Sequence, residues 1–108
     1  MKHHVVVPKK ISRKLKTKIP AKVRDLFVLL VDDIEEKGPE QPDWMNYSKL
    51  GEYTHHCHLN YSWVSVWRCE GEKIILEINK NEKVEKIKVE VEYVGSRENA
   101  PYDGKGKN

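Results

Sequence analysis

The sequence predicts an α+β fold in which two N-terminal helices pack on one face of a small antiparallel sheet. Three observations lead to this prediction. A short apolar run opens the chain, apolar residues then recur every three or four positions up to Gly38, and beyond residue 52 they recur every second position. A period near 3.6 is typical of a helix and a period of two is typical of a strand. Helices kept apart from a run of strands are typical of the α+β class.

The first elements are expected to be one strand and two helices. His3–Val7 is an apolar run that ends at Pro8, where a strand needs no further backbone donor. Lys10–Lys18 has a thin apolar stripe among basic residues, which favours a short amphipathic helix. Residues Ile19–Lys37 predict a longer helix, and Gly38-Pro39 ends it. Its apolar face consists of Val23, Leu26, Phe27, Leu30, Val31 and Ile34.

The second half of the chain is expected to form three or four antiparallel strands. Residues 39–52 are rich in proline, glycine and small polar residues and predict a loop, with Trp44 and Tyr47 as its anchors. Tyr53–Leu59 and Trp63–Cys69 predict a hairpin, and Lys73–Ile78 predicts the next strand. The last strand should end at Gly95 and should pack against the longer helix through Ile87, Val89, Val91 and Tyr93.

The length of 108 residues fits a single domain, which we place at residues 1–102, with a flexible tail over 103–108. The longest apolar run, Leu26–Val31, is far shorter than the ~20 residues that a membrane span needs, so no membrane partner is expected. The N-terminus lacks the apolar core of a secretory signal, which predicts a cytoplasmic protein. Cys57 and Cys69 are too few for a disulfide framework or a four-thiolate zinc site. Two reduced thiols and one bridge between them are both open.

The net charge of +3 conceals a strong asymmetry. Nine of the 20 Lys and Arg residues fall within the first 24 positions, which contain no acidic residue, and the rest of the chain is acidic on balance. Such a block is typical of binding to a phosphate backbone, and a solvated helix face is the alternative that charge alone leaves open. Arg68 is a further candidate contact, or is simply exposed. The expected phosphate-binding residues of the block are Lys9, Lys10, Arg13, Lys14, Lys16 and Lys18.

Two segments resemble the RelE/ParE superfamily of prokaryotic toxins, especially its mRNA-interferase branch. Leu50–Leu59, running on through Trp63–Trp67, is similar to the central hairpin of that family. Val94-Gly95-Ser96-Arg97, followed by Tyr102, is similar to the end of its last strand. The order of elements resembles the family along nearly the whole chain.

The chain also departs from the family pattern. His56 and His58 stand where better-known members have Arg or Lys, and Trp63 stands where another arginine is often found. Residues 79–86 add length between the last two strands. The resemblance therefore supports the fold more firmly than the activity.

Several side chains have the chemistry that RNA cleavage without a metal requires. Such cleavage needs a base for the 2′-hydroxyl, a cation for the phosphate and an acid for the leaving 5′-oxygen. His56 and His58 are two apart in one expected strand, so both should point to one face, and imidazole titrates near pH ~6.5. Arg97 could hold the phosphate through its guanidinium. Tyr102 offers a hydroxyl and a ring on which a base can stack.

Other interpretations of these residues remain open. A His-x-His pair on a strand can be a solvated face, and with His3 and His4 it could bind zinc, although we expect no metal and no cofactor. Cys57 could be a nucleophile or a buried, unreactive thiol. Tyr102 could simply hold the chain end in place.

The resemblance implies the toxin component of a toxin–antitoxin system. The expected activity is an endoribonuclease that cleaves mRNA, at the ribosome, by metal-free acid–base catalysis and so inhibits translation. The expected partners are a cognate antitoxin, mRNA and the ribosome. The alternative is a non-catalytic module of the same fold that binds RNA or a protein such as DNA gyrase, since some relatives inhibit gyrase and cut no RNA.

Overall fold

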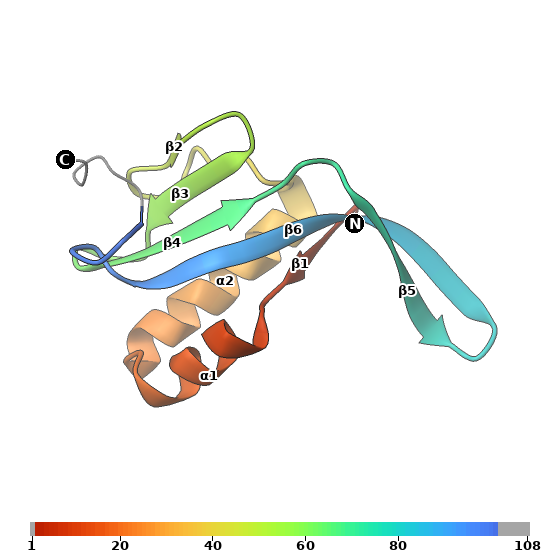
Figure 1. Ribbon diagram of the computed structural model, residues 1–108, viewed down its shortest axis with the longest axis horizontal. Coiled ribbons are helices and arrows are strands. Elements are labelled where there is room, and N and C mark those ends of the chain that lie inside the picture. Colours follow the sequence, from red (N-terminus) through yellow and green to blue (C-terminus); the bar gives the residue numbers. More distant parts are fainter. Residues whose placement is uncertain (1, 102–108) are drawn as a thin grey trace.

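The computed structural model describes residues 2–101, and it confirms the α+β class. One strand and two helices come first, and the remaining strands follow (Figure 1). Tyr102 and the expected tail over 103–108 lie outside the described residues. The elements are β1 (His3–Val6), α1 (Lys9–Thr17), α2 (Ala21–Lys37), β2 (Ser48–Lys49), β3 (Thr54–His58), β4 (Trp63–Arg68), β5 (Lys73–Asn79) and β6 (Glu82–Ser96).

The two helices begin and end at residues whose chemistry suits those places. Pro8 and Pro20 directly precede α1 and α2, where a missing backbone N–H leaves no helical bond unmade. Gly38 follows α2 with a φ of 103°, a region that favours glycine. The predicted apolar face of α2 is confirmed. Val23, Phe27, Leu30 and Ile34 are buried in the core, and Leu26 and Val31 pack against it.

The strands form one sheet in the order β1-β6-β4-β3-β2, and β5 pairs with β6 outside this path. The predicted β3–β4 hairpin is confirmed. β1, however, pairs with β6 in parallel, with His3 opposite Ile87, so the expectation of a purely antiparallel sheet is wrong at this edge. Side chains alternate in the same way in both kinds of strand, so the sequence pattern carries no information about strand direction.

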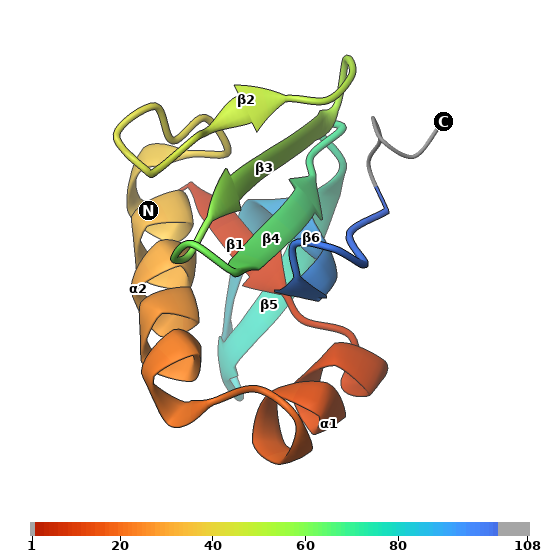
Figure 2. The same ribbon diagram turned by 90° about the vertical axis from the view of Figure 1, so that its left-hand side faces the viewer.

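α2 lies against one face of the sheet, and α1 lies below the end of β6 (Figure 2). Val89 and Val91 are buried in the core that includes α2, as predicted. Ile87 does not reach this core, and it is only half-buried where β6 leaves the body of the domain. β1 pairs with β6 only as far as Glu90. Beyond Glu90, α1 borders this edge of β6 in place of another strand.

A β-bulge reverses the face of Tyr93. β4 pairs Val66 with Tyr93 but pairs the next residue, Trp67, with Val91, so one residue of β6 is extra. An extra residue shifts the alternation of all side chains that follow it. The prediction that Tyr93 packs against the longer helix is therefore wrong. Val94 occupies that face and is 1% exposed.

The loop after α2 is anchored as predicted. The indole N–H of Trp44 donates to a carboxylate oxygen of Asp33, 2.8 Å away. The hydroxyl of Tyr47 lies 2.7 Å from Nδ1 of His55, whose ring stacks on Trp67. These contacts hold the loop against α2 through Trp44 and against the sheet through Tyr47. The chain that follows can then pair with β3 as β2, a strand that the sequence analysis missed.

β5 and the first part of β6 form a two-stranded arm that extends beyond the body of the domain (Figure 1). The arm includes residues 79–86, which join β5 to β6 and form the first part of β6. Among the described residues, no helix is long and apolar enough to cross a bilayer.

Candidate functional site

His56 and His58 lie on one face of the sheet, as predicted, and we call this side the histidine face. In β3, His55 and Cys57 belong to the side that faces the core, whereas His56 pairs with Val66 and His58 with Val64 on the opposite side. The ring centroids of His56 and His58 are 5.8 Å apart, at an angle of 62°. The pair is not a solvated face, because both residues are buried.

His56 is held from the neighbouring strand β2. Nδ1 of His56 lies 3.1 Å from the hydroxyl of Ser48, its register partner. Burial lowers the pKa of His56, a hydrogen bond with the backbone of Ser48 raises it, and the nearby His58 lowers it again. Ser48 was not predicted as a site residue, because a two-residue strand is too short to show a periodicity in the sequence.

His58 has a different environment. Only 7% of the residue is exposed, and among residues 2–101 no hydrogen bond engages its ring. Burial lowers the pKa of His58, and the positive charge of Arg97 lowers it further. Buried polar groups are usually paired, so a buried imidazole without a hydrogen bond requires an explanation, and a catalytic role is one.

Arg97 lies just beyond β6 and is exposed, in agreement with the expectation that it serves no core. Its backbone N–H donates to the carbonyl of Ser62 at 2.8 Å, which continues the β4–β6 ladder by one step. Along that row, His58 pairs with Val64 and Val64 pairs with Gly95. Neighbouring strands are about 4.8 Å apart, so the end of β6 lies within side-chain reach of the histidines. Arg97 also lines a shallow groove of about 270 Å³ with Tyr61, Ser62, Trp63, Ser96 and Glu98.

Lys14 of α1 reaches the same side of the sheet. Its ammonium group lies 4.6 Å from the centroid of the Tyr93 ring, and the hydroxyl of Tyr93 donates to the carbonyl of Ser96 at 2.8 Å. A Cβ added at Gly95 would lie 2.6 Å from Nζ of Lys14. Burial lowers the pKa of Lys14, and the charge of Lys18 lowers it further. Lys14 therefore occupies the space that a side chain at Gly95 would fill.

The other predicted phosphate-binding residues fall into two groups. Lys9, Lys10, Arg13, Lys16 and Lys18 lie exposed on or directly after α1, the helix that packs against β6. Lys10 and Lys14 line a groove of about 450 Å³ between α1 and β6, where Glu90 and Glu92 supply opposing charge. Arg68, in contrast, is bound to Glu70 and donates to Thr54 Oγ1 at 3.1 Å, so it is less available to a ligand.

The environment of Cys57 bears on whether its thiol can act as a nucleophile. Burial raises the pKa of Cys57 to about 12, so the thiol stays protonated at neutral pH and is a poor nucleophile. Cys57 and Cys69 are both free. No group of three or more His, Cys, Asp or Glu side chains within residues 2–101 could hold a metal ion.

The structure brings together His56, His58 and Arg97, and it adds Lys14, Tyr93 and Ser48 to their surroundings. The sequence signal for Lys14 and Tyr93 was Gly95, because a glycine within a strand often marks a close approach of another group. Tyr102 lies outside the described residues, so its place relative to the histidines is not part of this geometry. No family model, curated protein or solved structure matches the chain.

Proposed function

We propose that this protein is an RNA-cleaving toxin of the RelE type, with His56, His58 and Arg97 at its active site. The observation that carries the proposal is His58, a buried imidazole that has no hydrogen bond among the described residues and lies near a second imidazole and a guanidinium. Acid–base cleavage of a phosphodiester uses this set of groups.

The chemistry follows from the protonation states. The lowered pKa values of both histidines, caused first by burial, leave the imidazoles neutral near pH 7. One neutral imidazole takes the proton of the 2′-hydroxyl, whose oxygen attacks phosphorus. The bond from phosphorus to the 5′-oxygen breaks, and the second imidazole, which takes up a proton from solvent once the anionic phosphate is bound beside it, gives that oxygen a proton. The products are a 2′,3′-cyclic phosphate and a 5′-hydroxyl.

The cations have separate tasks in this proposal. The guanidinium of Arg97 stabilises the charge that develops on the phosphate. Lys14 extends the positive surface from the histidine face to α1, whose exposed lysines bind the flanking phosphates. A cognate antitoxin would cover this basic surface, and mRNA on the ribosome is the proposed substrate.

The test is cleavage of RNA by purified protein, alone and on ribosomes, with mapping of the new 5′ ends. Wild-type protein should cut, whereas Arg97→Gln and His58→Gln should each cut about a hundredfold to a thousandfold more slowly. His4→Gln is the matched control, because His4 lies on β1 beside Glu35 and not on the histidine face, and it should cut at the wild-type rate. Equal cleavage by wild type and Arg97→Gln would refute the assignment of Arg97 to the active site.

A non-catalytic binding module is the second candidate, and the exposed basic residues of α1 favour it, because they can bind phosphates without an acid–base pair. The same surface would then bind RNA, or a protein such as DNA gyrase, without cutting. RNA binding by α1 with no cleavage on or off ribosomes, and inhibition of growth that survives His58→Gln, would identify this second function.

A further inference from the structure

The outer edges of β1, β2 and β5 differ in how far they are protected. At the β1 edge, the backbone N–H of Val5 donates to a carboxylate oxygen of Glu35 at 2.9 Å, so α2 closes that edge. At the opposite edge, β2 has only two residues, Ser48 and Lys49. β5 has seven residues and pairs with β6 alone. β5 is therefore the long open edge of this sheet.

The backbone groups of β5 that point away from β6 can be identified from the hydrogen bonds. The N–H of Lys88 donates to the carbonyl of Glu72, whereas the N–H of Ile87 donates away from β5 to Lys2. Bonded and non-bonded pairs alternate along an antiparallel ladder. Lys73, the partner of Ile87, therefore points its backbone groups outward, and so do Ile75 and Glu77. No hydrogen bond engages these outward groups within residues 2–101.

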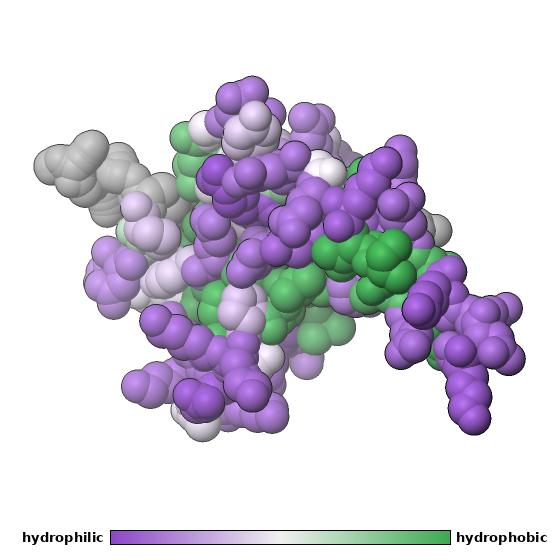
Figure 3. Space-filling model, turned by 45° about the vertical axis from the view of Figure 1, so that its right-hand side comes forward, coloured by the Kyte–Doolittle hydropathy of each residue, from purple (hydrophilic) through white to green (hydrophobic). Residues whose placement is uncertain are grey.

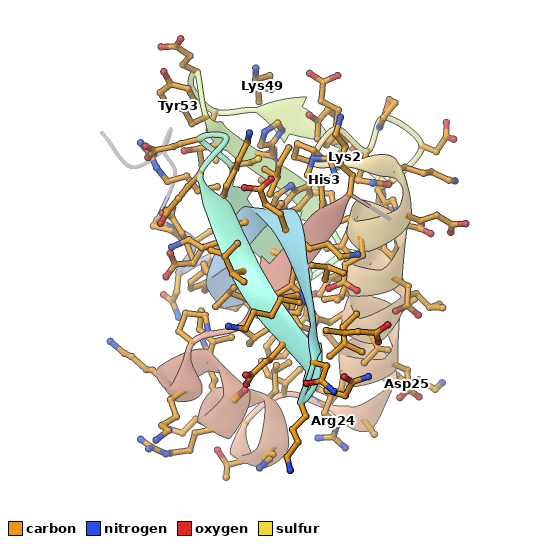
Figure 4. The ribbon with its side chains drawn as sticks, turned by 90° about the vertical axis from the view of Figure 1, so that its right-hand side faces the viewer. Lys2, His3, Arg24, Asp25, Lys49 and Tyr53 are labelled. Atoms are coloured by element: carbon orange, nitrogen blue, oxygen red, sulfur yellow. The ribbon has the colours of Figure 1, made fainter. Side chains whose placement is uncertain are left out.

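The side chains of the arm also lack cover. Ile75 and Ile78 are 62% and 59% exposed. Figure 3 shows apolar side chains gathered where the arm leaves the body, with polar side chains at its tip. Figure 4 shows β5 standing in front of the rest of the chain. A two-stranded hairpin is marginally stable in water, and an exposed apolar edge strand favours pairing with another strand.

The sequence of β5 is complementary to itself. Its central residues read Lys-Ile-Ile-Leu-Glu from Lys73 to Glu77. When two copies pair antiparallel about Ile75, each Lys73 lies opposite Glu77 of the other copy. Ile74 lies opposite Leu76, and Ile75 lies opposite itself. The outward backbone groups of Lys73, Ile75 and Glu77 then bond only to one another. If the axis of pairing moved by one residue, Lys73 would lie opposite Ile75 or opposite Asn79. The pairs between Lys73 and Glu77 would then be lost.

We infer that this protein forms a symmetric dimer in which β5 pairs antiparallel with β5 of a second copy, on a two-fold axis through Ile75. The occupant is a second copy because the charge order of the strand fits itself, and because a two-fold interface uses the same surface on both subunits. The pairing joins the two arms into a continuous four-stranded ribbon. The contact involves only the arms, so the dimer dissociates on dilution. It is independent of the histidine face and of the proposed cleavage.

The experiment measures molar mass against protein concentration by sedimentation or light scattering. Wild-type protein should change from monomer to dimer as its concentration rises. Glu77→Lys places lysine opposite lysine and Lys73→Glu places glutamate opposite glutamate, so each variant alone should be monomeric at concentrations where wild type is dimeric. A mixture of equal parts of the two variants should recover the dimer, because every lysine then faces a glutamate.

Matched controls keep the test decisive. Glu85→Lys changes the same charge on the arm but on β6, away from the outer edge of β5, and should dimerise as wild type does. Circular dichroism checks that each variant is folded. A wild type that stays monomeric at its highest concentration would overturn the inference and would leave the β5 edge for a different partner. A wild-type dimer that both charge variants retain, or a mixture that stays monomeric, would overturn it as well.

Discussion

Arg97 and His58 come from opposite ends of the second half of the chain, yet the charge of Arg97 acts on the proton of His58. Burial is the larger cause of the lowered pKa of His58, and Arg97 adds to it. The connection runs through the strand order β3-β4-β6, which leaves only β4 between the end of β6 and the end of β3. A residue 39 positions further along the sequence thereby helps to lower the pKa of the imidazole.

The first prediction follows from this pair. In Arg97→Gln the pKa of His58 should rise toward ~6.5, but should not reach it, because the burial remains. NMR titration of the imidazole resonances measures this. Arg68→Gln is the control, because the guanidinium of Arg68 is bound to Glu70, and it should leave the pKa of His58 in place. If the pKa of His58 stayed unchanged in Arg97→Gln, the charge of Arg97 would have no effect on His58.

Gly95→Ala should disturb the contact between α1 and β6. The added Cβ would lie 2.6 Å both from Nζ of Lys14 and from the hydroxyl oxygen of Tyr93, so at least one of these groups must move. Overpacking typically costs about 1–3 kcal/mol of unfolding free energy, and we expect the lower end because both atoms end side chains. Urea denaturation measures the loss. The loss should shrink when Lys14→Ala is combined with Gly95→Ala, and simple additivity of the two would contradict the clash with Lys14.

Binding of RNA through α1 should depend steeply on salt. Each phosphate that a cation neutralises contributes about −0.7 to the slope of log affinity against log salt for a single strand. The double variant Lys10→Gln/Arg13→Gln should flatten this slope. Lys80→Gln/Lys83→Gln makes the same change of net charge at the tip of the arm and should keep the wild-type slope. If the slope of log affinity against log salt were the same in the two double variants, the basic residues of α1 would form only a solvated helix face.

Neighbouring leucines of α2 provide a matched test of the core. Leu30 is fully buried, at 0% exposed, whereas Leu29 is 55% exposed. Leu30→Ala should lower the unfolding free energy by about 2–5 kcal/mol, because it removes buried apolar contacts and leaves a cavity. Leu29→Ala should change it by only about 0.5 kcal/mol or less. Similar losses from both in thermal or urea unfolding would contradict the packing of α2.

Acid should destabilise the protein through its buried histidines. Burial lowers the pKa of His55, the charge of Lys49 lowers it further, and Glu40 partly opposes this. The unfolded chain therefore binds a proton more readily below pH ~6.5 than the folded chain does. The unfolding free energy should fall as pH drops from that point through the folded-state pKa. His55→Gln should narrow the difference in stability between about pH 8 and about pH 5. An equal difference in wild type and variant would refute this cause.

The sequence by itself determined the α+β class, the apolar face of α2 and the shared face of His56 and His58. Each of these depends on a local period, and local periods can be read along the chain without knowledge of distant contacts. The same holds for the loop anchors Trp44 and Tyr47, which are isolated aromatic residues in a polar segment.

Only the tertiary structure decided the rest. The parallel pairing of β1, the bulge that turns Tyr93 away from the core and the two-residue strand β2 depend on which strands become neighbours. The approach of Lys14 to Gly95 and the effect of Arg97 on His58 depend on the same neighbours. The physical reason is that strand pairing and side-chain electrostatics are interactions through space between residues far apart in sequence. Hydrophobic periodicity records which face a side chain takes, and it does not record which distant residue lies beside it.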